Sequence, residues 1–298
     1  MSLGRNRVVA TLGIIASMIL SPASIWGATI RDDVPDSSYL ALAASPEYAP
    51  VGTFVNSWGY TGCGTLIAPD WVLTAAHMLT AASSGTFTIN GTSYTSTQLI
   101  SNPGWTGAAT NGYDFGLVHL SSPVTGVTPA TLYTGSSDFA QIGTFVGYGF
   151  TGTGLTGYQL PPDTLKRAFQ NVIDGDYGNP SLLLGCDFDN PHTTANNFFG
   201  STEPLPLEGC VAPGDSGGGV FITIDSQTYL EGVISFVAGT SASGGNGNSV
   251  YGDVSGFGRV SAFAPWIDGI VGVPEPPVFA LLAGAGLFVL LGRRRASS

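Results

Sequence analysis

The glycine-rich sequence Pro213-Gly214-Asp215-Ser216-Gly217-Gly218-Gly219 leads directly into a β-rich run over residues 220–224. Glycine permits backbone conformations with φ > 0 that other residues avoid. A serine in such a setting can sit on a sharp turn, with its Oγ exposed beside converging backbone N–H groups. Those N–H groups form an oxyanion hole when they stabilise the charge that develops in acyl transfer. The same residue types also suit an ordinary turn between two strands, so this sequence alone leaves both interpretations open.

Two other segments supply the partners that such a serine needs. The apolar run 70–77 ends in His77, and Asp114 heads the apolar segment 115–120. A serine hydroxyl is a poor nucleophile near pH 7 and needs an adjacent base, for which histidine has the right pKa. An acid beside that histidine orients the imidazole and stabilises the imidazolium. The chain therefore predicts a triad of His77, Asp114 and Ser216. Taken singly, each also suits an ordinary role, as a half-buried histidine, a turn aspartate or a loop serine.

These three segments together resemble the signature blocks of trypsin/chymotrypsin-like (S1-type) serine peptidases. The matching residues are Thr-Ala-Ala-His at 74–77, Asp114 before its apolar strand, and Gly-Asp-Ser-Gly-Gly at 214–218. The resemblance covers roughly residues 45 to 270. It implies His77 as the general base, Asp114 as its orienting acid and Ser216 as the nucleophile, with the backbone N–H groups of Gly214 and Ser216 as the oxyanion hole.

The resemblance also implies the fold. It predicts an all-β domain over residues 45–272, built as two six-stranded antiparallel β-barrels (about 45–125 and 130–270), with the active site between them and a short C-terminal helix. The composition agrees, because only 10% of the 298 residues are charged and 43 are glycine, which favours loop-rich β structure over helices. Without its two ends the chain keeps about 245 residues, enough for one large β domain or two small barrels.

Charge and ligand patterns exclude other classes of protein. The net charge is -11 and the chain has nine Lys and Arg residues with no basic patch, so nucleic acid is excluded as a partner. The spacings of a zinc site and of an EF-hand are both missing, and the sequence predicts neither a metal nor a cofactor. The chain order Ser, acid, His that an α/β-hydrolase needs is not present either.

The three cysteines, Cys63, Cys186 and Cys210, cannot pair completely. The resemblance places Cys63 where the family has the first cysteine of a bridge, but Met78 occupies the position after His77 that its partner would take. Cys186 and Cys210 are therefore the candidate disulfide. Cys63 is then a free, buried thiol.

The segment 232–237 is the predicted substrate-binding strand. The resemblance implies that its backbone contacts the substrate and that Ser235 hydrogen-bonds the triad acid. Phe236 and Val237 stand where the family usually has Trp-Gly. A valine in place of that glycine would narrow the specificity pocket toward small apolar side chains.

The floor of the specificity pocket has two candidate positions. In the family a residue six before the nucleophile forms it, but two residues within 211–213 look inserted here. Counting from Cys210 puts Glu208 at the floor, whereas counting from Ser216 puts Cys210 there. A Glu208 floor would favour basic side chains, in conflict with Val237. The sequence leaves both possibilities open, with a preference for small or medium apolar residues.

The N-terminus indicates export. Residues 1–28 combine a basic start, an apolar core and the small residues Gly27 and Ala28 as cleavage points, which is typical of a signal peptide. Residues 29–44 are predicted to be an N-terminal leader. In the resembled family a freshly cut N-terminus often inserts beside the acid before the nucleophile, here Asp215. The segment 29–31 is the candidate for this role, and a flexible leader is the alternative.

The C-terminal segment 273–298 is a separate unit. It contains Pro-Glu-Pro at 274–276, a short apolar run over 278–291 and three arginines at 293–295. This combination resembles the PEP-CTERM sorting tail of Gram-negative bacteria. It implies an exosortase-type enzyme that removes the tail and delivers the protein from the membrane to the cell surface or the extracellular matrix. A plain membrane anchor is the alternative.

Together these features predict an exported, monomeric serine endopeptidase that hydrolyses protein or peptide substrates through an acyl-enzyme. The alternative is a catalytically inactive, trypsin-like binding protein of the cell surface or matrix. The insertion before Gly214, the missing bridge at Cys63 and the atypical N-terminus favour that alternative.

Overall fold

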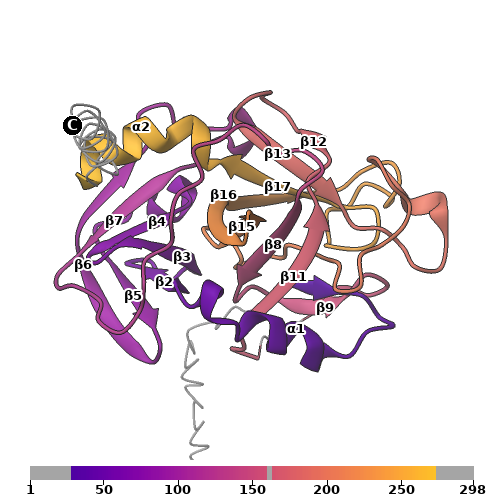
Figure 1. The fold of residues 1–298 in the computed structure, drawn as a ribbon, viewed down its shortest axis with the longest axis horizontal. Coiled ribbons are helices and arrows are strands. Elements are labelled where there is room, and N and C mark those ends of the chain that lie inside the picture. The colour runs from indigo at the N-terminus through magenta and orange to yellow at the C-terminus, as the bar shows by residue number, and fades with distance from the viewer. Residues whose placement is uncertain (1–27, 160–162, 273–298) are drawn as a thin grey trace, which may run out of the picture.

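The computed structural model describes residues 28–159 and 163–272. Its first half is a closed six-stranded antiparallel barrel with strand order β2-β3-β4-β7-β6-β5, on the indigo-to-magenta side of Figure 1. Alternate residues of each strand face the barrel interior, where Phe54, Leu66, Phe87 and Leu117 are fully buried. The strands are β2 (Val51–Asn56), β3 (Thr61–Ala68), β4 (Trp71–Thr74), β5 (Gly85–Ile89), β6 (Thr92–Ser101) and β7 (Gly116–Leu120).

The second half is a barrel-like sheet of seven strands, in the order β11-β8-β15-β16-β17-β13-β12. It differs from the six-stranded barrel that we expected, because β11 and β13 do not pair through their backbones. The Asn171 side chain of β11 spans this gap and donates to the Asp187 carbonyl of β13 at 2.6 Å. The strands are β8 (Ile142–Gly147), β11 (Arg167–Val172), β12 (Gly175–Asp176), β13 (Leu183–Asp187), β15 (Gly219–Ile224), β16 (Gln227–Ala238) and β17 (Val254–Arg259).

A small four-stranded sheet, in the order β10-β9-β1-β14, carries the start of the described chain. Its strand β1 (Thr29–Ile30) lies antiparallel to β14 (Gly209–Cys210) and parallel to β9 (Thr151–Thr153), which pairs with β10 (Gly157–Gln159).

Helix α1 (Asp36–Ala43) packs against β11. Its Asp36 carboxylate receives the buried Arg167 guanidinium at 2.6 Å. In place of a flexible leader, the segment after residue 28 is held against the second barrel (Figure 1).

The C-terminal helix α2 (Val260–Val271) returns to the first barrel (Figure 1). Its Phe263 ring stacks on Phe115 with centroids 4.1 Å apart, so both halves of the chain share one hydrophobic cluster. The short C-terminal helix is therefore confirmed. Four 3₁₀ helices complete the described elements: η1 (Pro46–Tyr48), η2 (Ala76–Leu79), η3 (Ala109–Asn111) and η4 (Thr194–Asn196).

The predicted disulfide between Cys186 and Cys210 is not formed, because both residues, like Cys63, are free and buried thiols. Cys186 faces Ser255 across the β13–β17 ladder, and the Ser255 hydroxyl donates to Cys210 Sγ at 3.3 Å. The Cys210 sulfur therefore has a serine hydroxyl, not a second sulfur, as its partner.

The two predicted targeting segments lie outside the described residues, apart from Ala28 at the end of the first. Within residues 28–159 and 163–272, no helix is both long and apolar enough to span a membrane.

Candidate active site

His77 and Asp114 are brought together by the ladder between β4 and β7. This ladder pairs Thr74 with Gly116, so η2 at the end of β4 meets the loop before β7. Asp114 Oδ2 lies 2.7 Å from His77 Nδ1, and Asp114 Oδ1 accepts the His77 backbone N–H at 2.8 Å. The carboxylate thus holds both the ring and the backbone of the histidine.

The third partner of Asp114 comes from the other half of the molecule. Ser235 in β16 donates its hydroxyl to Asp114 Oδ2 at 2.5 Å, as the family resemblance implied. The Asp114 side chain is 1% exposed and that of His77 is 32% exposed. An ionised carboxylate can only accept hydrogen bonds, so His77 Nδ1 carries the proton and Nε2 keeps its lone pair. In this tautomer Nε2 is the ring nitrogen that can accept a proton.

Ser216 lies on the loop between β14 and β15, which packs against β3 and the end of β4. The Cys63 N–H donates to the Ser216 carbonyl at 2.7 Å. Gly217 has φ +83°, and a Cβ there would meet the Cys63 carbonyl and Thr74 Oγ1 at 2.2 Å. Only glycine allows this close approach, which puts Ser216 beside the segment that leads into His77.

The side-chain atoms of Ser216 and His77 that the prediction expects to react are free of hydrogen bonds in the described structure. Within the described chain, neither Ser216 Oγ nor His77 Nε2 forms a hydrogen bond. In structures without substrate the contact between nucleophile and base is commonly long, and it tightens once substrate binds.

The backbone N–H groups of Gly214 and Ser216, the predicted oxyanion donors, lie on a loop whose neighbouring carbonyls are held. Pro213 and Asp215 have their carbonyls anchored, by the Phe150 N–H at 2.7 Å and the Gly218 N–H at 2.8 Å respectively. In a trans peptide the N–H points opposite to the C=O, so the Gly214 and Ser216 N–H groups point away from these anchors. Neither N–H has a partner among the described residues. Two fixed, unpaired donors are what an oxyanion hole requires.

Asp215, next to the nucleophile, is buried and accepts only backbone hydrogen bonds. The N–H groups of Gly149 and Ala212 donate to it at 2.8 Å each, and the Ala28 N–H donates as well. Burial raises the pKa of this carboxyl to about 6, although these three hydrogen bonds oppose the shift. We expected the segment 29–31 beside Asp215, and the structure places Ala28, one residue earlier, in contact with it.

A small pocket of about 60 Å³ opens beside Ser216. Four residues of the predicted substrate-binding strand, Ile234, Ser235, Phe236 and Val237, line it, and no charged side chain does so. Its lining is Val211, Ala212, Pro213, Ser216, Ile234, Ser235, Phe236 and Val237.

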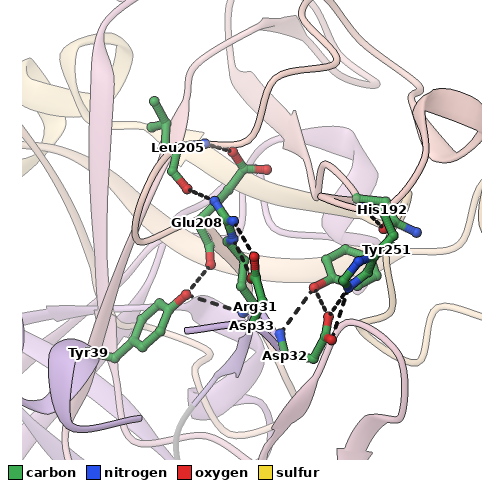
Figure 2. Close-up of polar contacts among 9 residues, drawn as sticks. Arg31, Asp32, Asp33, Tyr39, His192, Leu205, Glu208 and Tyr251 are labelled. Carbon is green, nitrogen blue, oxygen red and sulfur yellow. Dashed lines mark hydrogen bonds and ion pairs between the residues drawn. The ribbon is translucent and has the colours of Figure 1, made fainter. Parts of the chain in front are cut away.

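Glu208, one of the two candidates for the pocket floor, does not line this pocket. Its carboxylate accepts the N–H groups of Asp189 and Leu205 at 2.6 Å each, within a polar network that also contains Arg31 and Tyr39 (Figure 2). Burial raises the pKa of Glu208 to about 8, against the effect of these hydrogen bonds. The other candidate, Cys210, does not line the pocket either.

Sequence reasoning missed three contributors to the site. The contact of Ala28 with Asp215 had one signal, since the small residues at 27 and 28 mark a cleavage point. The Phe150 N–H that anchors Pro213 and the sulfur contacts of Cys63 had none, because these contacts join segments more than 60 residues apart.

The two barrel-like sheets, joined where Ser235 and His77 both contact Asp114, define a chymotrypsin-like fold. The Trypsin family model matches residues 43–267, and the chain therefore belongs to this family.

Relatives and solved structures agree with this assignment. Chymotrypsin-like elastase family member 1 of Rattus norvegicus is 29% identical over 235 residues, covering 72% of this chain and 80% of the relative. The Bos taurus protein of that name is 28% identical over 244 residues, with the same coverage. Neuropsin, a serine protease expressed in the limbic system of mouse brain, has a similar fold (TM-score 0.57, 16% identity, 76% of this chain and 97% of that one). So does HL collagenase (TM-score 0.57, 18% identity, 78% and 97%).

Proposed function

We propose that this chain is an exported serine endopeptidase. The observation that carries the proposal is the network in which Ser235 and Asp114 fix His77 as a base, beside Ser216 and two unpaired backbone N–H groups. Ser216 Oγ attacks the substrate carbonyl while His77 Nε2 takes its proton, and the oxyanion forms at the Gly214 and Ser216 N–H groups. His77 then gives the proton to the leaving amine as the C–N bond breaks. Water hydrolyses the acyl-enzyme by the same steps, and Ser216 regains its proton.

Active-site labelling tests this proposal. A fluorophosphonate probe incubated with the folded chain should modify Ser216 in a one-to-one ratio, as located by peptide mass spectrometry. The other serines and a heat-unfolded sample serve as controls, because an unactivated hydroxyl reacts far more slowly. If the folded chain stays unlabelled, the peptidase proposal is wrong, and a surface or matrix binding protein becomes the better description.

We propose that the substrate residue before the scissile bond has a small or medium apolar side chain. The pocket beside Ser216 is small and uncharged, and Glu208 lies away from it. The resemblance in sequence to relatives with elastase in their name is consistent with this preference.

Replacing Val237 with Gly should shift this preference toward larger side chains. Removing the isopropyl group enlarges the pocket, and a change of this size is worth about 10- to 200-fold in discrimination. The kcat/KM ratio for Phe over Val substrates should therefore rise at least about tenfold. The matched variant Glu208→Gln should leave the ratio of Lys to Val substrates unchanged. The assignment would be contradicted if Glu208→Gln lowered the kcat/KM ratio of Lys over Val substrates while Val237→Gly left the ratio of Phe over Val substrates unchanged.

We also propose that export completes the active site. Cleavage after Gly27 would leave Ala28 as the N-terminal residue, and its ammonium group would replace the amide N–H that now donates to Asp215. A buried carboxylate gains most from a partner of opposite charge. The rest of the segment is held in place by Arg31, which donates to the Leu205 carbonyl, and by Asp32, which accepts from Tyr251 and lies beside His192 (Figure 2).

A chain that begins at Ala28 should have a kcat/KM at least about 10² above that of a chain that begins at Gly27 or Arg31. Losing one partner of a buried ion pair costs about 3–5 kcal/mol, and neither of the other two forms has its ammonium group on Ala28. N-terminal sequencing of the exported protein, together with peptide hydrolysis by the three forms, measures this. The exposed variant Asp33→Asn controls for general disturbance of the segment and should keep full activity. Equal activity of all three forms would rule out the mechanism.

The localisation part of the proposal rests on sequence alone. The C-terminal segment 273–298 would tether the chain to the membrane of a Gram-negative bacterium until an exosortase-type enzyme removes it, releasing a monomer to the surface or matrix. The C-terminal peptide of the mature protein, identified by mass spectrometry, tests this, and an intact tail on all surface-exposed protein would contradict it.

A further inference from the structure

The loop that carries the oxyanion donors is anchored peptide by peptide. The outer two peptides, Pro213–Gly214 and Asp215–Ser216, have their carbonyls held by Phe150 and Gly218, as described above. Between them lies the Gly214–Asp215 peptide, whose N–H donates to the Ala212 carbonyl at 3.0 Å. A rotation of the middle peptide changes ψ of Gly214 and φ of Asp215, the torsions through which the two outer peptides keep their orientation relative to each other. The hold on the middle carbonyl therefore matters for both oxyanion donors.

That middle carbonyl is held by a thiol. Cys63 Sγ donates to the Gly214 carbonyl at 3.2 Å and accepts the Tyr148 N–H at 3.3 Å. The backbone of Cys63 is fixed as well, because its N–H donates to the Ser216 carbonyl at 2.7 Å and its carbonyl accepts Thr74 Oγ1 at 2.7 Å. All polar groups of this one residue are thus engaged, with partners in the first barrel, in the loop and at the end of β8.

The Cys63 thiol is protonated, as a donor to the Gly214 carbonyl must be. Cys63 is fully buried, and burial, with the nearby Asp215 carboxylate as a smaller cause, raises its pKa. The sulfur therefore keeps its proton, remains a donor and has no nucleophilic role. With Cys186 and Cys210 in the other half of the molecule and equally free, no bridge competes for this sulfur.

We propose that Cys63 is a positioning residue of the active site, whose S–H group fixes the Gly214–Asp215 peptide and thereby both oxyanion donors. This inference rests on the proposed peptidase activity. It concerns the transition state, in which the oxyanion forms, so it affects kcat more than KM.

Three replacements separate the hydrogen bond from packing. Cys63→Ser keeps a donor and loses volume, Cys63→Ala loses both, and Cys63→Val loses the donor and adds volume. A positioning role predicts that Ala and Val lower kcat by about 10- to 100-fold with KM within about twofold, and that Ser stays within about fivefold of wild type. A packing role predicts instead that Ser is as poor as Ala, because the two side chains have nearly the same volume. Cys186→Ala, a buried free thiol away from the loop, is the matched control and should keep full activity.

Hydrogen exchange of the peptide that spans residues 211–217 tests the anchor without any substrate. Exchange in Ala and Val should be about tenfold faster than in wild type, and Ser should be close to wild type. If the probe fails to label wild type while this exchange pattern holds, the proposed function is wrong and the anchor is real. Unchanged exchange in all three variants, or activity that follows volume, would overturn the role of the thiol.

Discussion

Replacement of Ser216 with Ala is expected to lower kcat for peptide hydrolysis by about 10⁶. The hydroxyl oxygen is the atom that forms the acyl-enzyme, and the other hydroxyl in the lining of the pocket of about 60 Å³ beside it, that of Ser235, donates its proton to Asp114. The oxyanion donors and the pocket stay in place, so the variant should still bind substrate with a similar affinity. Single-turnover hydrolysis of a peptide with an apolar residue before the scissile bond measures the loss.

The exposed hydroxyl of Ser93, in the β5–β6 hairpin, offers a matched control. Ser93→Ala should hydrolyse the peptide at the wild-type rate. Hydrolysis by Ser216→Ala within tenfold of wild type would show that another group is the nucleophile and would contradict the mechanism.

Replacement of Asp114 with Asn is expected to lower kcat by about 10⁴ near neutral pH. Asp114 Oδ2 faces two donors, His77 Nδ1–H and the Ser235 hydroxyl, while Oδ1 accepts the His77 N–H. An amide places an NH₂ group where an acceptor is needed. If that group faces Nδ1, the ring turns to the tautomer with its proton on Nε2, which cannot accept a proton from Ser216.

Double variants test whether Asp114 acts through His77. Because the two residues work as a unit, Asp114→Asn combined with His77→Ala should be little slower than His77→Ala alone. Independent contributions would instead multiply the two losses. Activity of Asp114→Asn within tenfold of wild type would show that the acid has no orienting role.

The fold, and the three segments predicted to supply the triad, were accessible from sequence because each part has a local signature. His77 follows an apolar strand, Asp114 precedes one, and Ser216 lies among glycines that only a tight loop requires. The closed first barrel, the barrel-like second sheet and the C-terminal helix agree with the prediction. The chain order of these segments and the rules for antiparallel pairing leave little freedom in how they meet.

The remaining features depend on contacts that no local pattern encodes. The pairing of β14 with β1 places Glu208 in the network with Leu205 and Asp189, so counting residues back from Ser216 could not assign the pocket floor. The pairing of Cys186 and Cys210 failed for a similar reason. The direction of a buried side chain depends on strand register, and the register here puts Ser255 against the Cys210 sulfur.

The absence of a bridge among Cys63, Cys186 and Cys210 has a consequence for how this protein matures. A secreted domain that depends on disulfides must wait for an oxidant, and a wrong pairing must be broken and remade. This chain needs no oxidant to form disulfide bonds during folding. Reductants in the medium have no disulfide bond to attack. The three buried thiols are protonated, so they do not start thiol–disulfide exchange. Folding of the described domain is therefore expected to proceed equally with and without a reductant in the medium.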